Sequence, residues 1–372
     1  MTAMYHNDTR TVATLDAGGT NLVFGAMRGC EFIIEPISLS AEPESFDVSL
    51  QAIVCGFTQV FDRLEDKPVA ISFAFPGLGD YPSGIVGGTL NFPAFRNGVA
   101  LGPFLEEKFG IPVFINNDGN LFAFGEATGG MLPIVNNRIA NLGGHKVYKN
   151  LIGFTLGTGI GIGQVINGHL NVGDNSCVEA CFLRNKSNPS IMAEDGVSAR
   201  AVVREYNVMS GKDDPHLTPY DVFLIAEGKE KGDVDAARQS FAKLGEIAGD
   251  VFATAALLAD ALIVVGGGLT GAMKYIMPSL LAEMRSTIST IRGDEMHRLP
   301  VHVFNLEDEE EFASFAAGDL REIPVPGTDR KVIYDSMKRI GVAVSKIGAS
   351  KAVSIGAYNF ALAQMDSGGI LR

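Results

Sequence analysis

The stretch TVATLDAGGTNLVFGAM (residues 11–27) joins two apolar runs through a turn that holds one carboxylate and two adjacent glycines. The apolar runs predict two buried strands that form a hairpin. Glycine lets a backbone approach a ligand closely, and successive N–H groups in such a turn attract anions. Asp16 would repel a bare phosphate, so its presence favours a divalent cation, since Mg²⁺ combines carboxylates with phosphate oxygens. We therefore predict a phosphate turn at Gly18, Gly19 and Thr20, with Mg²⁺ near Asp16.

Two further glycine turns follow apolar strands, LGTGIG (156–161) and VVGGGLTG (264–271). The first of them contains no acid and reads as a phosphate cradle. The second lies between a strand and a helix, which suits the phosphate or sugar-base part of a nucleotide. Strand, glycine turn and strand at 11–39 recur at 150–170, which indicates an internal duplication.

These turns also fit simpler interpretations. A single glycine-rich hairpin turn is more often only a tight turn. Gly266, Gly268 and Gly271 also fit the G-x-G-x-x-G motif of a dinucleotide fold, but the second strand ending in an acid about 20 residues later is missing. No G-x-x-x-x-G-K-[ST] occurs, which excludes the P-loop class.

Strands and helices alternate along the first half, so the chain is expected to have an α/β fold. Strands are predicted at 67–75, 111–117 and 301–306, and helices at 48–64, 101–110, after Asp118, over most of 190–260, and at 347–364. Residues 261–284 read as strand, turn and helix. The acidic and then proline-rich segment 307–335 yields no assignment.

Composition excludes several classes of protein. The 372 residues carry a formal net charge of -13, which argues against nucleic acid as a partner. No run approaches the roughly 18 apolar residues of a membrane span, and the first ten residues lack the apolar core of a signal peptide. Four cysteines do not make a disulfide scaffold, so we expect a cytoplasmic protein without membrane association.

Asp118 follows the apolar strand IPVFI and precedes a helix. Its carboxylate is therefore expected at the carboxyl end of a strand, where α/β proteins bind ligands. It reads either as a helix N-cap or as a base that accepts a proton from a substrate hydroxyl during phosphoryl transfer.

Four motifs in this order, LDAGGTN, NND (116–118), LGTGIG and VVGGG, resemble the ROK sugar kinases, which belong to the actin, Hsp70 and hexokinase superfamily. The resemblance implies a duplicated ribonuclease-H-like (actin-like ATPase) fold of two domains with a central cleft. A small domain would comprise 1–117 and about 347–372, and a large domain 118–346. We also expect a homodimer.

The resemblance also implies roles for individual residues. Asp118 matches the catalytic base, and Asp16 serves Mg²⁺. Phosphate and nucleotide contacts fall on Asp16 and on the three glycine turns, at Gly18, Gly19, Thr20, Gly157, Thr158, Gly159, Gly266, Gly267 and Gly268. Sugar contacts fall on Asn91, Asn117, Asp118, Glu179 and Glu194.

The sequence departs from the family in two respects. EACF (179–182) replaces the usual E-x-G-H, and RNKSNPSIM (184–192) replaces a cysteine-rich zinc loop. No histidine lies near Cys177 and Cys181, and structural zinc needs four close ligands, so we expect no zinc.

The resulting prediction is ATP-dependent and Mg²⁺-dependent phosphorylation of a free hexose, with glucose at the 6-hydroxyl as first choice. Fructose, mannose and N-acetylhexosamines are alternative substrates. The competing hypotheses are a catalytically inactive sugar-binding homologue, a DNA-binding sugar sensor and an ATPase or acetate-kinase-like member of the superfamily. The sensor is disfavoured because only about ten residues precede the first strand and the net charge is negative.

Overall fold

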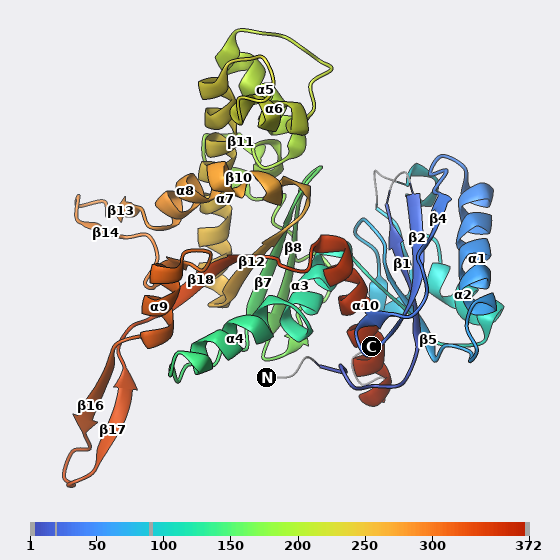
Figure 1. The fold of residues 1–372 in the computed structure, drawn as a ribbon, viewed down its shortest axis with the longest axis horizontal. Helices are drawn as coiled ribbons and strands as arrows, with labels where there is room; N and C mark the ends of the chain where they lie inside the picture. Colours follow the sequence, from blue (N-terminus) through green and yellow to red (C-terminus); the bar gives the residue numbers. More distant parts are fainter. Residues whose placement is uncertain (1–3, 19–20, 89–91, 369–372) are drawn as a thin grey trace. The chain divides into compact units, whose positions relative to one another are not determined.

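The structure, a computed structural model, describes residues 4–18, 21–88 and 92–368. The chain forms two compact units (Figure 1). The first comprises Met1–Pro133, Ile162–Val178 and Lys346–Arg372, and the second Ile134–Gly161 and Glu179–Ser345.

The first unit is built on a mixed six-stranded sheet in the order β3-β2-β1-β5-β6, with β4 paired to β2. β1 runs antiparallel to β2 and parallel to β5, and β5 runs parallel to β6. The strands are β1 (Val12–Ala17), β2 (Asn21–Arg28), β3 (Glu31–Phe32), β4 (Ile37–Ser40), β5 (Ala70–Ala74) and β6 (Val113–Asn116).

Helices cover both faces of this sheet. One face packs on α1 (Phe46–Asp62) and α2 (Leu101–Phe109), where Phe57 and Leu105 join a core with Leu15, Phe24 and Phe73. The other face packs on α10 (Ala349–Asp366), and α10 in turn packs on α3 (Asp118–Thr128). Two 3-10 turns, η1 (Tyr81–Ser83) and η2 (Pro93–Phe95), lie between β5 and α2.

Close backbone contacts explain why α3 and residues 162–178 group with the first unit. A Cβ at Gly125 or Gly356 would lie 1.9 Å from a carbonyl oxygen of the facing helix, so glycine lets α3 and α10 touch. A Cβ at Gly119 would lie 2.5 Å from the Ile162 carbonyl oxygen. The first compact unit thus continues past residue 118, where the boundary between the domains was expected. The expected domain limits stay a prediction.

The second six-stranded sheet has the order β15-β18-β12-β7-β8-β9, and the chain passes from the second unit to the first within β8. β7, β12, β18 and β15 are parallel. The strands are β7 (Leu151–Leu156), β8 (Ile160–Ile166), β9 (His169–Leu170), β12 (Leu262–Gly266), β15 (His302–Asn305) and β18 (Arg339–Val344).

Helices and three hairpins complete the second unit. The long α7 packs closely on α8. Glycine is needed at Gly245 and Gly249 of α7, because a Cβ at these positions would lie 2.3 and 2.5 Å from carbonyl oxygens of α8. The helices are α4 (Met131–Asn141, which begins in the first unit), α5 (Ala199–Ser210), α6 (Pro219–Ala226), α7 (Val234–Ala259), α8 (Met273–Met284) and α9 (Glu309–Ala317), with η3 (Ala193–Asp195) and η4 (Gly268–Ala272). The hairpins are β10 (Arg184–Asn185) with β11 (Asn188–Met192), β13 (Thr287–Ser289) with β14 (Glu295–His297), and β16 (Leu320–Pro324) with β17 (Lys331–Asp335).

The predicted α/β alternation is confirmed, including the strand-turn-strand unit at 150–170 and the strand, turn and helix over 261–284. The unassigned segment 307–335 contains α9 and the β16–β17 hairpin, and β18 follows it. Among the described residues, no helix is both long and apolar enough to cross a membrane.

Candidate active site

Polar side chains gather where the parallel strands of the first sheet end. Asp16 of β1 is in register with Ala74 of β5, and Ala74 is in register with Asn116 of β6. Residues aligned across a sheet point to the same face, so Asp16 and Asn116 share a face two strand spacings apart, about 10 Å. This is the face that α10 covers, and Ser350 in the first turn of α10 hydrogen-bonds the Asp16 carboxylate.

Asp118 is the first residue of α3, separated from the end of β6 by Asn117 alone. The N-cap is Asn117, whose side-chain oxygen accepts the Asn120 N–H at 2.9 Å. The interpretation of Asp118 as the cap is therefore wrong, because the helix begins one residue earlier than that interpretation requires. One Asp118 carboxylate oxygen accepts the Gly119 N–H at 2.9 Å.

Asn116, the last residue of β6, holds the backbone at the start of α3. It is 3% exposed, and its Oδ1 accepts the backbone N–H of Asn117 and the side-chain N–H of Asn120, both at 2.9 Å. Hydrogen bonds on both sides thus hold the backbone around Asp118, whereas the Asp118 side chain itself is exposed.

Asp16 and Asp118 both have raised pKa values. The pKa of Asp118 is raised by desolvation, because protein atoms around the carboxylate exclude water from it although the residue is exposed. The hydrogen bond from the Gly119 N–H opposes this shift. For Asp16 the pKa is raised by desolvation first and then by the negative charge of Asp118, while Ser350 opposes the shift. The negative charge of one carboxylate disfavours ionisation of the other, and a bound cation would offset this repulsion.

The structure describes only part of the first glycine turn, for which phosphate binding is predicted. Gly19, Thr20 and the sugar-contact candidate Asn91 lie outside the described residues. Gly18 donates its N–H to the Asn21 carbonyl oxygen at 3.0 Å, which closes the hairpin between β1 and β2.

The second turn, between β7 and β8, is closed by its own backbone. Gly157 donates to the Gly159 carbonyl at 3.0 Å and accepts from the Ala199 N–H, at the start of α5, at 2.7 Å. Thr158 at its tip is exposed. A Cβ at Gly157 would meet no atom within 4 Å, so this side of the turn has room for a ligand.

Glu194 lies directly against this second turn. A Cβ at Gly159 would stand 2.1 Å from a Glu194 carboxylate oxygen, and the Ile160 N–H donates to the same oxygen at 3.4 Å. Arg200 donates to the other carboxylate oxygen at 3.2 Å. The sequence predicted a sugar contact for Glu194. It did not predict a role for Arg200, which the sequence marks only by its position six residues after Glu194.

Glu179 and Glu194 flank one thiol of the second unit. Cys181 Sγ lies 3.8 Å from a Glu179 carboxylate oxygen. Burial and then the charges of Glu179 and Glu194 raise the pKa of Cys181 to about 12. A thiol held protonated in this way is a poor metal ligand, and among the described residues no three histidine, cysteine or acidic side chains cluster as a metal site.

In the third turn the backbone requires glycine at position 267, whereas a side chain at position 268 would meet open space. Gly267 has φ +96°, and a Cβ there would lie 2.3 Å from the Leu156 carbonyl oxygen at the end of β7. Gly266 ends β12, and Gly268 begins η4 with nothing within 4 Å of its absent Cβ. The second and third turns therefore meet at the ends of the adjacent parallel strands β7 and β12.

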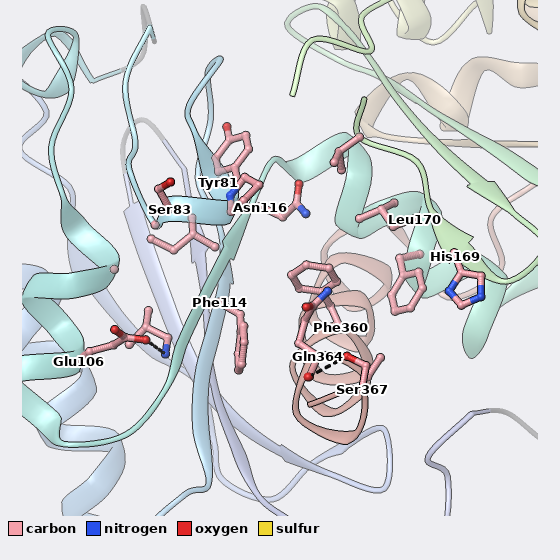
Figure 2. Close-up of a pocket in the computed structure, with 18 of the residues that line it drawn as sticks. Tyr81, Ser83, Glu106, Phe114, Asn116, His169, Leu170, Phe360, Gln364 and Ser367 are labelled. Carbon is pink, nitrogen blue, oxygen red and sulfur yellow. Dashed lines mark hydrogen bonds between the residues drawn. The ribbon is translucent and has the colours of Figure 1, made fainter. Parts of the chain in front are cut away.

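A cavity of about 350 Å³ also lies in the first unit (Figure 2). Phe360 contacts both Phe114 and Phe124 along its wall, and Asn116 and Gln364 add polar groups. Its lining includes neither Asp16 nor Asn117 nor Asp118. Asn116 lines this cavity and also holds the backbone beside Asp118, so the cavity adjoins the candidate active site without including its acids.

A sequence model of the ROK family matches residues 12–308. The solved structure of a glucokinase from Parabacteroides distasonis ATCC 8503 is 51% identical, with a TM-score of 0.87, over 96% of this chain and 99% of that one.

Curated relatives match at lower identity. A glucokinase from Thermotoga maritima is 26% identical over 75% of this chain and 92% of its own length. A xylose repressor from Bacillus spizizenii is 31% identical over 35% of this chain, and an N-acetyl-D-glucosamine kinase from Photobacterium profundum is 32% identical over 43%. The matches to the last two span only 30% and 48% of their lengths.

Proposed function

The chain belongs to the ROK family, and on this premise we propose that it phosphorylates a free hexose, glucose first, at the 6-hydroxyl with ATP and Mg²⁺. The observation that carries the proposal is the likeness to a glucokinase over nearly the whole of both chains, at 51% identity. The paired acids Asp16 and Asp118 supply the chemistry that this activity needs.

The arrangement of the two sheets supports a duplicated, actin-like ATPase fold. In the first sheet β1 lies between β2, its partner across a glycine turn, and the parallel strand β5. In the second sheet β7 lies between β8, again across a glycine turn, and the parallel strand β12. The same order around the same turn is what a duplication produces.

Asp118 is the proposed base. Its carboxylate accepts the proton of the sugar hydroxyl as the hydroxyl oxygen bonds to the γ-phosphorus and the bond from that phosphorus to the β-phosphate oxygen breaks, leaving ADP. The raised pKa of Asp118 makes it a stronger base than an ordinary aspartate. Its backbone is fixed by Asn116 and Asn117, which orients the carboxylate before substrate arrives.

Asp16 fits a ligand of Mg²⁺, directly or through water, because its carboxylate is desolvated and lies in the field of Asp118. When bound, Mg²⁺ neutralises charge on the transferring phosphates. The three glycine turns, at Gly18 and Gly19, at Gly157 and Gly159, and at Gly266–Gly268, are proposed to bind phosphates and nucleotide, with hydroxyl donors from Thr20 and Thr158. The N–H groups of Gly18 and Gly157 close their own turns, so the phosphate contacts are assigned to the other groups of these turns.

Amide and carboxylate side chains are proposed to bind the sugar, because they accept and donate to several hydroxyls at once. These are Asn91, Asn117, Glu179 and Glu194. Glu194 also lies against Gly159 of the turn between β7 and β8.

An N-acetylhexosamine is the second candidate substrate, because the chain matches an N-acetyl-D-glucosamine kinase at 32% identity over 160 residues. A repressor role is disfavoured by the net charge of -13, although one relative is a xylose repressor.

A coupled ADP-release assay tests the proposal. The purified chain with Mg²⁺ and ATP is given glucose, mannose, fructose, N-acetylglucosamine or N-acetylmannosamine, with Asp118→Asn as the inactive control. We expect turnover that depends on sugar and is fastest with glucose. Absence of sugar-dependent ADP release across the panel would overturn the kinase proposal, and a preference for an acetamido sugar would overturn the glucose assignment alone.

A further inference from the structure

The β16–β17 hairpin of the second unit is a two-stranded ribbon that extends away from α9 and β18 (Figure 1). All of β16 and the residues Lys331 to Tyr334 of β17 are exposed, and only Asp335 at the base is half-buried. Isolated two-stranded hairpins are marginally stable in water, and stability normally requires a third strand or a packed face. A ribbon of this kind therefore favours a partner.

The two edges of the ribbon differ. The β16 edge carries the adjacent charges Arg321 and Glu322 and then Pro324, which are the devices that keep an edge strand from pairing. Both strands expose apolar side chains, but β17 has no proline, its charges Lys331 and Asp335 stand at its ends, and its centre is the run Val332, Ile333 and Tyr334, exposed by 40%, 70% and 42%. Of the two strands, β17 is the one open to a further strand.

The hydrogen bonds of the hairpin show which β17 groups face this open edge. Val325 donates to the Arg330 carbonyl at 2.8 Å, and Ser336 donates to the Asp319 carbonyl at 2.9 Å. Because bonded and non-bonded pairs alternate along an antiparallel ladder, Val332 and Tyr334 point their backbone groups at β16. The N–H and C=O groups of Lys331, Ile333 and Asp335 consequently point outward.

The sequence of β17, KVIYD, is complementary to itself when reversed. In an antiparallel pair centred on Ile333, Lys331 stands opposite Asp335 and Val332 opposite Tyr334. All three positions with outward backbone groups then form bonded pairs, which gives about six hydrogen bonds by this geometry. Opposite charges directly across a pair of strands are stabilising, and so are aromatic residues across from β-branched ones.

We propose that β17 pairs with β17 of a second copy of this chain across a two-fold axis through Ile333, forming a four-stranded sheet between the copies. The ion pair of Lys331 with Glu322, at 2.9 Å, is highly exposed and therefore weak, so Lys331 can turn to the carboxylate opposite it in the second copy. Asp335 is held in place by Arg339 at 2.6 Å.

Two proline substitutions test the pairing directly. Ile333→Pro removes an outward N–H at the axis from each copy and leaves the hydrogen bonds inside the hairpin intact. Glu322→Pro makes the same change on the β16 edge and is the matched control. Sedimentation and light scattering give the mass, and circular dichroism confirms that both variants are folded.

We expect the wild type and Glu322→Pro to have twice the chain mass of 39.5 kDa, and Ile333→Pro to have the single mass. Sugar-dependent turnover, which this inference does not require, serves as a separate readout. A monomeric wild type, or a dimeric Ile333→Pro variant, would overturn the proposal.

A cysteine pair gives a second, independent measurement. Residues of a bonded antiparallel pair have Cα atoms about 5.5 Å apart, within the range of a disulfide. Ile333→Cys should therefore form a cross-linked dimer on mild oxidation, whereas Glu322→Cys should not exceed the background from the native exposed thiols Cys55 and Cys177. Equal cross-linking of the two variants would refute the register.

Discussion

Replacing Asp118 with asparagine separates its proposed chemistry from its place in the fold. The substitution keeps the shape of the side chain and an oxygen that can accept the Gly119 N–H. The helix cap is untouched, because Asn117 provides it. What the variant loses is a proton acceptor and one negative charge beside Asp16.

The expected loss of rate follows from the role of a general base. Removing such a base costs on the order of 100- to 10,000-fold, and at about 1.4 kcal/mol for each factor of ten this raises the barrier by roughly 3–5 kcal/mol. Sugar affinity without nucleotide should change much less, because Asn117 and the acids of the second unit are unaltered.

The stability of the variant has a defined direction. The pKa of Asp118 is raised in the folded protein, so the folded state binds this proton more tightly than the unfolded chain does. The stabilisation from that proton is complete below the ordinary aspartate pKa of about 3.9 and is lost as pH rises through the raised value, so the charged carboxylate lowers stability at neutral pH. At pH 7, Asp118→Asn should unfold at a temperature equal to or above that of the wild type, with the difference shrinking towards pH 4.

The assay combines turnover from coupled ADP release, sugar affinity from calorimetry and melting temperature across pH. Asp47→Asn is the matched control, since it removes an exposed acid from the first turn of α1. We expect the control to keep normal turnover. A well-folded Asp118→Asn variant that retains more than about a tenth of the wild-type rate, a smaller loss than removing a base usually causes, would refute the assignment.

Three further outcomes are expected. Asp16→Ala should abolish turnover while sugar binding measured without nucleotide survives, and equal loss of sugar affinity would show that Asp16 does not serve the metal. Gly267→Ala should lower the free energy of unfolding by about 1–3 kcal/mol in chemical denaturation, because alanine is strained at φ +96° and its Cβ would meet the Leu156 carbonyl; Gly268→Ala, with open space, is the control and should lose less. Elemental analysis of purified protein should find well under one zinc per chain, and stoichiometric zinc lost together with the fold on chelation would contradict the protonated state of Cys181.

Local patterns were sufficient to predict most elements of the fold. Apolar runs followed by a glycine-rich turn predicted β1, β7 and β12, since a buried strand and a tight turn are both encoded within a few residues. Within the unassigned segment 307–335, the β16–β17 hairpin was not predicted because its strands lack a buried face and so lack the periodicity that marks one. The helix α9 in the same segment was also missed, although Phe312, Phe315 and Ala316 bury one of its faces. The hairpin is identified only by the residue pairs that join β16 to β17 in the folded structure.

The sequence by itself determined the order of strands, glycine turns and helices, and the positions of Asp16 near the end of β1 and of Asp118 after β6, because each depends on neighbours along the chain. Tertiary structure alone decided that Asp16 and Asp118 share one electrostatic environment, and that Glu194 touches the turn at Gly159. It also decided that Asn117, not Asp118, caps α3. These facts depend on the register between strands and on close approaches such as that of Gly125 to α10, distances that no local pattern of residues encodes.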